Sequence, residues 1–250
     1  MEPAVLRDDM VDSLEHEAKA VVRSERVSVA MRTVPREPFV DDDAAAYADR
    51  SFERLGTRVL SPSAAGRLFE ALEARPDDSV LVVGSGVGYT AAVLAELTDE
   101  ANVHAIDITR RLVSDARSNL SAAGYPGVLV DRRDGARGLA EYAPYDRILL
   151  EAAAVEPPQA LLDQLTPDGR LVMPLGGATQ DLVAIEGGDR VAEYGTVAFY
   201  PMLVDGEQAD TIERNRTRRE DREHARRAAD RRKGWEQSWI DWDRTPDGSP

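Results

Sequence analysis

The loop Gly84–Gly88, with glycine at every second position, directly follows the apolar run Val80–Val83. Residues without a side chain let a ligand lie against the main chain, and the segment after the loop continues as a helix. A second apolar run, Val103–Ile106, ends at Asp107. A carboxylate at this place can accept hydrogen bonds from ribose hydroxyls, so the pattern is typical of a site for a nucleoside-bearing cofactor.

The spacing of the glycines indicates which cofactor the loop would hold. A dinucleotide fingerprint has its third glycine one position later, where this chain has Tyr89. The observed pattern, G-x-G-x-G, suits a ligand without phosphate, such as S-adenosylmethionine. From these residues alone, a glycine-rich strand-to-helix turn that binds nothing stays open as the alternative.

Strand-like and helix-like segments alternate through the middle of the chain, which predicts an α/β fold with a mostly parallel, doubly wound sheet. The expected strands span residues 80–83, 103–106, 128–130, 147–151 and 170–174, followed by a late antiparallel hairpin of residues 182–186 and 191–200. The expected helices span residues 63–74 (starting at Ser63 or Ala64), 90–97, 110–122 and 158–165. Ligands of such sheets bind beyond the carboxyl ends of the strands, where loop 84–88, Asp107 and Asp134 fall.

The N-terminal segment carries apolar residues at helical spacing, namely Val11, Leu14, Ala18, Val21 and Val22. We expect one or two amphipathic helices in residues 1–30 and a loop-rich connector with two prolines in residues 31–49. Residues 1–50 would then form a helical lid on a domain that spans residues 1–205.

Composition excludes several classes of protein. The chain has no cysteine, which excludes disulfides and thiolate chemistry, and its histidines, His16, His104 and His224, are too scattered to predict a metal site. No apolar run is long enough to cross a membrane, and the first residues lack the pattern of a secretory signal, so a cytoplasmic location is expected. The net charge is −15 and only two of the 31 basic residues are lysine, as in proteins of extreme halophiles, where salt screens the self-repulsion.

Residues 206–250 differ in composition from the domain and are expected to form a helical tail. Residues 211–233 carry ten basic side chains against five acidic ones, and Trp235, Trp239 and Trp242 follow on one face of the expected helix. Because exposure of three indoles is costly, we expect this face to dock on the acidic domain or on a second copy, giving a homodimer. Binding to nucleic acid is less favoured, because the domain is acidic and salt weakens such binding.

Several stretches, in the same order and at similar spacing, resemble the protein-L-isoaspartate O-methyltransferases. They cover roughly residues 25–186 and comprise Val34–Val40, Ala46–Asp49, Gly84–Tyr89 with Ala91–Ala95, Asp134–Gly135, Ala143–Ile148, Gln164–Leu165 and Gly169–Gly176. The resemblance implies a Rossmann-like methyltransferase that transfers a methyl group from S-adenosylmethionine to the carboxylate of isoaspartyl residues in damaged proteins. The implied partners are isoaspartyl-containing peptides or proteins.

The same resemblance assigns contacts to the cofactor. S-adenosylmethionine would lie over the glycine loop, Asp107 would bind the ribose hydroxyls, and Asp134 would approach the adenine amino group. The expected cofactor-binding residues are Gly84, Ser85, Gly86, Gly88, Tyr89, Asp107, Ile108, Asp134 and Gly135. From the residues alone, Asp134 could equally be a turn aspartate that binds its own backbone.

The substrate side departs from the pattern of the family. A family serine that would bind the isoaspartyl group aligns with Leu60, and Ser61 is one residue off. Ser61 is a candidate catalytic residue only if the backbone shifts, and it is otherwise expected to be a helix N-cap or a turn serine ahead of Pro62. Val82 and Glu151 are further departures. Two alternative hypotheses therefore remain: a methyltransferase of the same fold with another substrate, and a non-catalytic, cofactor-binding interaction protein.

Overall fold

The structure, a computed structural model, describes residues 2–42 and 45–204. These residues lie in the first of two compact units of the chain, Met1–Arg214. The tail expected at residues 206–250, with its tryptophans and the homodimer contact inferred from them, lies outside the described residues and stays a prediction.

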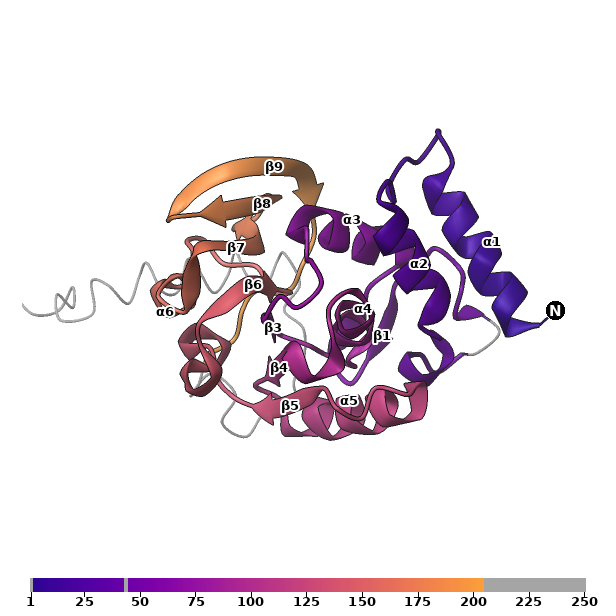
Figure 1. Ribbon diagram of the computed structural model, residues 1–250, viewed down its shortest axis with the longest axis horizontal. Coiled ribbons are helices and arrows are strands. Elements are labelled where there is room, and N and C mark those ends of the chain that lie inside the picture. The colour runs from indigo at the N-terminus through magenta and orange to yellow at the C-terminus, as the bar shows by residue number, and fades with distance from the viewer. Residues whose placement is uncertain (1, 43–44, 205–250) are drawn as a thin grey trace, which may run out of the picture. The chain divides into compact units, whose positions relative to one another are not determined.

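A seven-stranded sheet forms the centre of the described region (Figure 1), in the order β5-β4-β3-β6-β7-β8-β9. The strands from β5 to β7 are parallel, and β8 and β9 add an antiparallel hairpin. The strands are β3 (Val80–Val83), β4 (Val103–Asp107), β5 (Leu129–Arg132), β6 (Tyr145–Leu150), β7 (Leu165–Gly176), β8 (Gln180–Glu186) and β9 (Asp189–Val197). The predicted α/β fold, mostly parallel sheet and late hairpin are confirmed.

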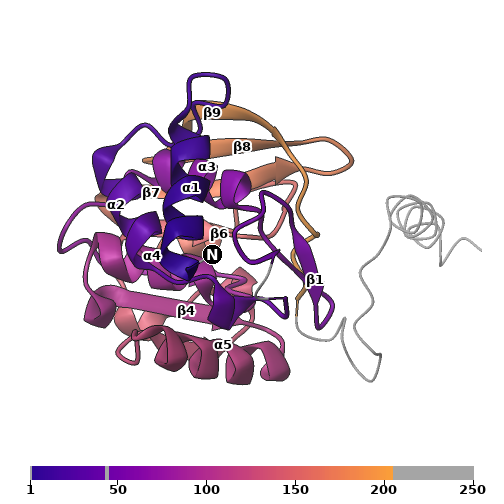
Figure 2. The same cartoon turned by 90° about the vertical axis from the view of Figure 1, so that its right-hand side faces the viewer.

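Helices cover the two faces of the sheet unequally. They are α1 (Pro3–Glu15), α2 (Glu25–Thr33), α3 (Pro62–Leu72), α4 (Tyr89–Leu97), α5 (Arg110–Ala123) and α6 (Gln159–Leu162). Val80 and Val82 belong to a core shared with α3, α4 and α5, whereas Leu81 and Val83 belong to a second core with α6. The α2 helix packs on α4, and α1 packs on α2 (Figure 2). Burial on both faces explains why β3 is apolar along its whole length.

A short hairpin that the sequence patterns do not indicate lies between the N-terminal helices and α3. Its strands are β1 (Phe52–Arg54) and β2 (Thr57–Val59), and the turn residues Leu55 and Gly56 have φ values of 51° and 83°. Two residues at positive φ are typical of a tight hairpin turn. The strands are only three residues long, which is too short for alternation of apolar and polar residues to be read from the sequence.

Several predicted boundaries are wrong by a few residues, and one of these errors has a clear cause. The helix expected at 158–165 has only four residues, because Leu165 already pairs with Tyr145 at the start of β7. The expectation of one or two helices in residues 1–30 is confirmed by α1 and α2, although the apolar spacing continues beyond α1 to Ala18, which is exposed, and Ala20 has a φ of 45°. The other main shifts are α3 at Pro62–Leu72 instead of 63–74, β5 at Leu129–Arg132 instead of 128–130, β6 at Tyr145–Leu150 instead of 147–151, and β9 ending at Val197 instead of 200.

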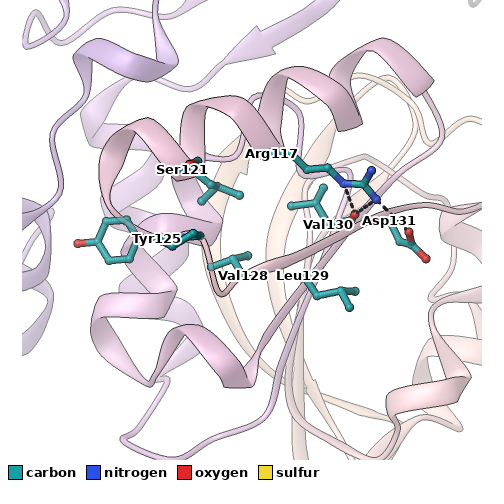
Figure 3. A pocket seen from close by; sticks show the side chains of 9 residues that line it. Arg117, Ser121, Tyr125, Val128, Leu129, Val130 and Asp131 are labelled. Carbon is teal, nitrogen blue, oxygen red and sulfur yellow. Dashed lines mark hydrogen bonds and ion pairs between the residues drawn. The ribbon is translucent and has the colours of Figure 1, made fainter.

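Arginine side chains bind main-chain carbonyls on both edge strands of the sheet. Arg117 of α5 donates through Nε (2.9 Å) and Nη2 (2.6 Å) to the carbonyl of Val130 in β5. Figure 3 shows this contact at a surface pocket of about 430 Å³. At the opposite edge, Arg67 of α3 donates to the carbonyls of Tyr194 (2.6 Å) and Thr196 (3.3 Å) in β9. The arginines therefore occupy main-chain carbonyls of β5 and β9, and unpaired carbonyls are the groups that an edge strand usually exposes.

Candidate functional site

The loop Gly84–Gly88 joins β3 to α4 and has a backbone conformation that favours glycine. Its three glycines have φ values of 80°, 52° and 96°. The amide of Gly84 donates to the carbonyl of Ile106 at 2.8 Å, which fixes the loop to the end of β4. A side chain at Gly88 would lie 3.2 Å from Leu120, so this glycine allows α5 to pack closely against the loop.

The Asp107 carboxylate lies beside the loop and is held by main-chain amides. Its Oδ2 accepts from the amide of Gly86 at 3.1 Å and its Oδ1 from the amide of Thr109 at 2.8 Å. The carbonyl of Asp107 accepts from the amide of Arg133 at 3.1 Å, which brings the loop after β5 to the same place. Each carboxylate oxygen has a second lone pair, so Asp107 can still accept hydrogen bonds from a ligand.

Three other residues expected near the cofactor offer different groups. The Ser85 hydroxyl is buried and has no hydrogen-bond partner among the described residues. The ring of Tyr89 packs in the core, with its centre 5.6 Å from that of Phe39, and its buried hydroxyl also has no hydrogen-bond partner among the described residues. Ile108 is half-buried in the loop after β4.

Asp134 and Gly135 lie in the loop after β5, as the topology predicts. Asp134 Oδ1 accepts from the amide of Ala136 at 2.9 Å, which agrees with the interpretation of Asp134 as a turn aspartate. This bond uses one of several acceptor positions of the carboxylate, so a contact with adenine stays open. A side chain at Gly135 would lie 2.6 Å from Val83, so packing on β3 already requires a glycine here.

The candidate substrate residues lie at the start of α3. Ser61 is the N-cap of this helix: its Oγ accepts from the amide of Ala64 at 3.2 Å, and Pro62 follows in the first turn. The expectation that Ser61 is a helix cap is confirmed. Leu60 is half-buried, and its carbonyl accepts from Nη2 of the fully buried Arg36 at 2.9 Å. The side chain of Arg36 therefore holds the backbone at the family serine position in place.

Glu151, which the sequence marks only as a departure from the family pattern, lies beside the glycine loop on the β6 side of the site. It follows β6, the neighbour of β3 on the side opposite β4. A side chain at Gly84 would lie 3.7 Å from the carbonyl carbon of Glu151, and the Thr90 hydroxyl donates to the Glu151 carboxylate. Position is the signal that could have found this residue, because ligands of α/β sheets bind where the strand order reverses, here between β3 and β6.

The surface pocket of Figure 3 does not belong to this site. Residues of α5, β5 and the turn between them line it, and none of the expected cofactor-binding residues is among them. Within residues 2–42 and 45–204, no three His, Asp or Glu side chains are grouped so that they could hold a metal ion. Over the same ranges, every helix is too short or too polar to cross a membrane.

Comparison with known proteins decides whether the ordered stretches reflect common ancestry. The sequence model of the family described as protein-L-isoaspartate(D-aspartate) O-methyltransferase matches residues 7–208. The chain belongs to this family. A protein-L-isoaspartate O-methyltransferase of Methanocella arvoryzae is 42% identical over 180 residues, which cover 69% of this chain and 96% of the relative. One of Aeropyrum pernix is 42% identical over 178 residues, covering 69% of this chain and 67% of the relative.

Solved structures of protein-L-isoaspartate O-methyltransferases agree with the fold. A crystal structure from Plasmodium falciparum, described as a beta-aspartate methyltransferase in complex with S-adenosyl-L-homocysteine, superposes with a TM-score of 0.71 at 19% identity. The match covers 79% of this chain and 98% of the other. A second protein-L-isoaspartate O-methyltransferase gives a TM-score of 0.66 at 21% identity, covering 78% of this chain and 65% of the other. The family thus has the Rossmann-like methyltransferase fold expected from the sequence.

The residues at the glycine loop fit S-adenosylmethionine, the cofactor expected from the sequence. A side chain built on Gly86 would have, within 4 Å, only Thr57 at 3.7 Å among the described residues, so the main chain of the loop is bare on this side. The buried Ser85 hydroxyl lacks a partner, and the Asp107 carboxylate can accept further hydrogen bonds. A bare backbone, a hydroxyl and a carboxylate match a ligand with ribose hydroxyls and no phosphate.

Replacement of Asp107 by alanine is expected to weaken binding of S-adenosylmethionine by roughly 1.5–3 kcal/mol, the value of a hydrogen bond to a charged group. Titration calorimetry of the purified variant measures this loss. The matched control is Asp99→Ala, since Asp99 makes the same kind of bond to the amide two residues ahead, that of Ala101 at 2.9 Å. The control should bind the cofactor normally, and undiminished affinity of the Asp107 variant would remove Asp107 from the cofactor site.

Proposed function

We propose that this family member transfers a methyl group from S-adenosylmethionine to the side-chain carboxylate of isoaspartyl residues in proteins. The observation that carries the proposal is the glycine loop hydrogen-bonded to Asp107 at the carboxyl ends of β3 and β4, in a chain of this family. The names of the relatives state this reaction, and the Plasmodium falciparum structure holds the demethylated cofactor.

Each side of the proposed site would make a separate contribution. Bound S-adenosylmethionine would supply an activated methyl group on its sulfonium. Asp107 would hold the ribose hydroxyls, the loop Gly84–Gly88 would support the ligand with main-chain groups, and Asp134 would contact adenine. An isoaspartyl carboxylate is already ionised at pH 7, so the protein needs to align it and exclude water rather than remove a proton. In the methyl ester formed, the main-chain nitrogen of the next residue can displace methanol to close a succinimide, and hydrolysis of this ring returns part of it to normal aspartate.

A methyltransferase with another substrate is a second candidate, and the start of α3 favours it. Leu60 offers no hydrogen bond to a substrate carboxylate, and the Ser61 hydroxyl lies one residue further on, where it accepts from the amide of Ala64 as the N-cap of α3. The family serine therefore has no evident substitute at this position. In this alternative, the cofactor half of the site is retained and the acceptor differs.

The proposal can be tested with two peptides of the same sequence, one with an isoaspartyl residue and one with a normal aspartyl residue. The assay measures the transfer of labelled methyl groups from S-adenosylmethionine to each peptide. We expect labelling of the isoaspartyl peptide alone. The assay needs both low and high salt, because the acidic, lysine-poor composition favours a protein adapted to salt. Cofactor binding without labelling of either peptide would favour the second candidate, and no cofactor binding at any salt concentration would contradict both.

The remaining expectations from the sequence are part of the same proposal. They are the helical lid at residues 1–50, the domain limit at residue 205, the homodimer through residues 206–250, the cytoplasmic location and the absence of nucleic acid among the partners. The packing of α2 on α4, whose first residue directly follows the glycine loop, supports the lid.

A further inference from the structure

Glu151 is a partly buried acid at the switch point of the sheet, and the described residues that face it carry no positive charge. It faces Gly84 from the β3 loop, Thr90 from α4 and Asp107 from β4. Two of these residues are uncharged and the third is another acid. Among the described residues, no ion pair includes Glu151.

Burial, and to a smaller degree the charge of Asp107, raise the pKa of Glu151 to about 8, while the hydrogen bond from Thr90 acts in the opposite direction. An acid in this state is mostly neutral at pH 7. It ionises readily when a cation arrives, since an opposite charge nearby favours the charged form. The position is therefore suited to a positively charged group of a ligand.

The order of the strands indicates which part of the ligand reaches Glu151. Asp107 and Asp134 follow β4 and β5, on one side of β3, and Glu151 follows β6, on the other side. A ligand whose nucleoside lies over the ends of β4 and β5 must extend across the glycine loop toward β6. In S-adenosylmethionine, the group opposite the nucleoside is an amino acid, and its ammonium carries the N–H donors that a carboxylate can accept.

We propose that the Glu151 carboxylate binds the ammonium group of the amino-acid part of S-adenosylmethionine. The inference rests on the proposed use of this cofactor and goes beyond the family pattern, from which Glu151 departs. Pairing with the ammonium also neutralises the charge of Glu151. The substrate carboxylate therefore meets no unpaired negative charge at this side of the site.

Two ligands separate this role from a structural one. S-adenosylhomocysteine keeps the ammonium and lacks the sulfonium, and its deaminated analogue lacks both. We expect Glu151→Gln to bind S-adenosylhomocysteine about ten- to a hundredfold more weakly than the unchanged protein and to bind the deaminated analogue equally well. The matched control, Glu156→Gln, alters an exposed acid five residues further along the chain and should change neither affinity.

Proton release gives a second measurement that does not depend on activity. Binding of the ammonium lowers the pKa of Glu151 from about 8, so at pH 7 the unchanged protein should release a proton on binding S-adenosylhomocysteine. Calorimetry in two buffers of different ionisation enthalpy measures this proton, and Glu151→Gln should release none.

The proposal for Glu151 alone would be overturned if Glu151→Gln lost affinity equally for both ligands. Proton release that is unchanged in this variant would also overturn it. Failure of the unchanged protein to bind S-adenosylhomocysteine would overturn it together with the proposed function.

Discussion

Gly86→Val is expected to abolish binding of S-adenosylmethionine while the domain stays folded. A valine at this position would project from the bare side of the glycine loop, where its Cβ meets only Thr57 at 3.7 Å among the described residues. The side chain is therefore tolerated in the protein alone but fills the space that the ligand needs. Titration calorimetry should detect no binding, which corresponds to a loss of affinity of more than about a hundredfold.

The control for this variant separates the loss of space from backbone strain. Gly187 has a φ of 58°, close to the 52° of Gly86, and a Cβ added to Gly187 would meet no atom of the described residues within 4 Å. Valine at either position should lower the free energy of unfolding by about 1–3 kcal/mol, as expected for a residue in the left-handed region. Gly187→Val should keep full affinity for the cofactor. Binding by the Gly86 variant that equals this control would contradict the assignment of the loop.

Leu60→Ser is expected to raise the kcat/KM for an isoaspartyl peptide by roughly 10- to 100-fold, the effect of one hydrogen bond to a charged group. The bond from Arg36 to the carbonyl of residue 60 involves the main chain, so it is retained in the variant. The new hydroxyl would then stand where the family has its serine. Steady-state kinetics with the isoaspartyl peptide measure the gain, and the affinity for S-adenosylmethionine should not change.

Two comparison variants make the result specific. Leu60→Ala removes the apolar side chain without adding a hydroxyl and should give no gain. Ser61→Ala removes the N-cap of α3 and should lower the free energy of unfolding by about 0.5–2 kcal/mol with little change in turnover. A large fall in turnover for Ser61→Ala, without a gain for Leu60→Ser, would show that Ser61 binds the substrate after all.

Features of the site that depend on neighbours in sequence could be predicted. The strand Val80–Val83 is recognisable because burial on both faces makes four consecutive residues apolar, and the glycine loop because its turn needs positive φ at fixed positions. Ser61 could be predicted as a helix cap because its bond reaches only three residues ahead. Because parallel strands share one carboxyl edge, the positions of Asp107 and Asp134 after their strands predicted that both lie at this edge of the sheet.

Features that depend on distant partners could not be predicted. The ring of Tyr89 packs against Phe39, which lies in another segment of the chain, and no pattern around Tyr89 predicts this contact. Position 135 needs glycine because the loop after β5 packs against Val83 of β3, which is distant in the sequence. The bond between Thr90 and Glu151 spans 61 residues, and no local pattern predicts it.

The arginines of α5 and α3 that bind carbonyls of the two edge strands have a consequence for aggregation. An edge strand with open carbonyls is a template on which a strand of another chain can add, and many proteins guard it with the charge of lysine. This chain has only two lysines, and charge repulsion reaches only about 3 Å at 1 M salt. Arg117 and Arg67 instead donate hydrogen bonds to the carbonyls of Val130 and Tyr194, so these two acceptors are already occupied and cannot pair with an added strand. Protection against edge-to-edge aggregation at these carbonyls should therefore persist in brine, where repulsion alone would fail.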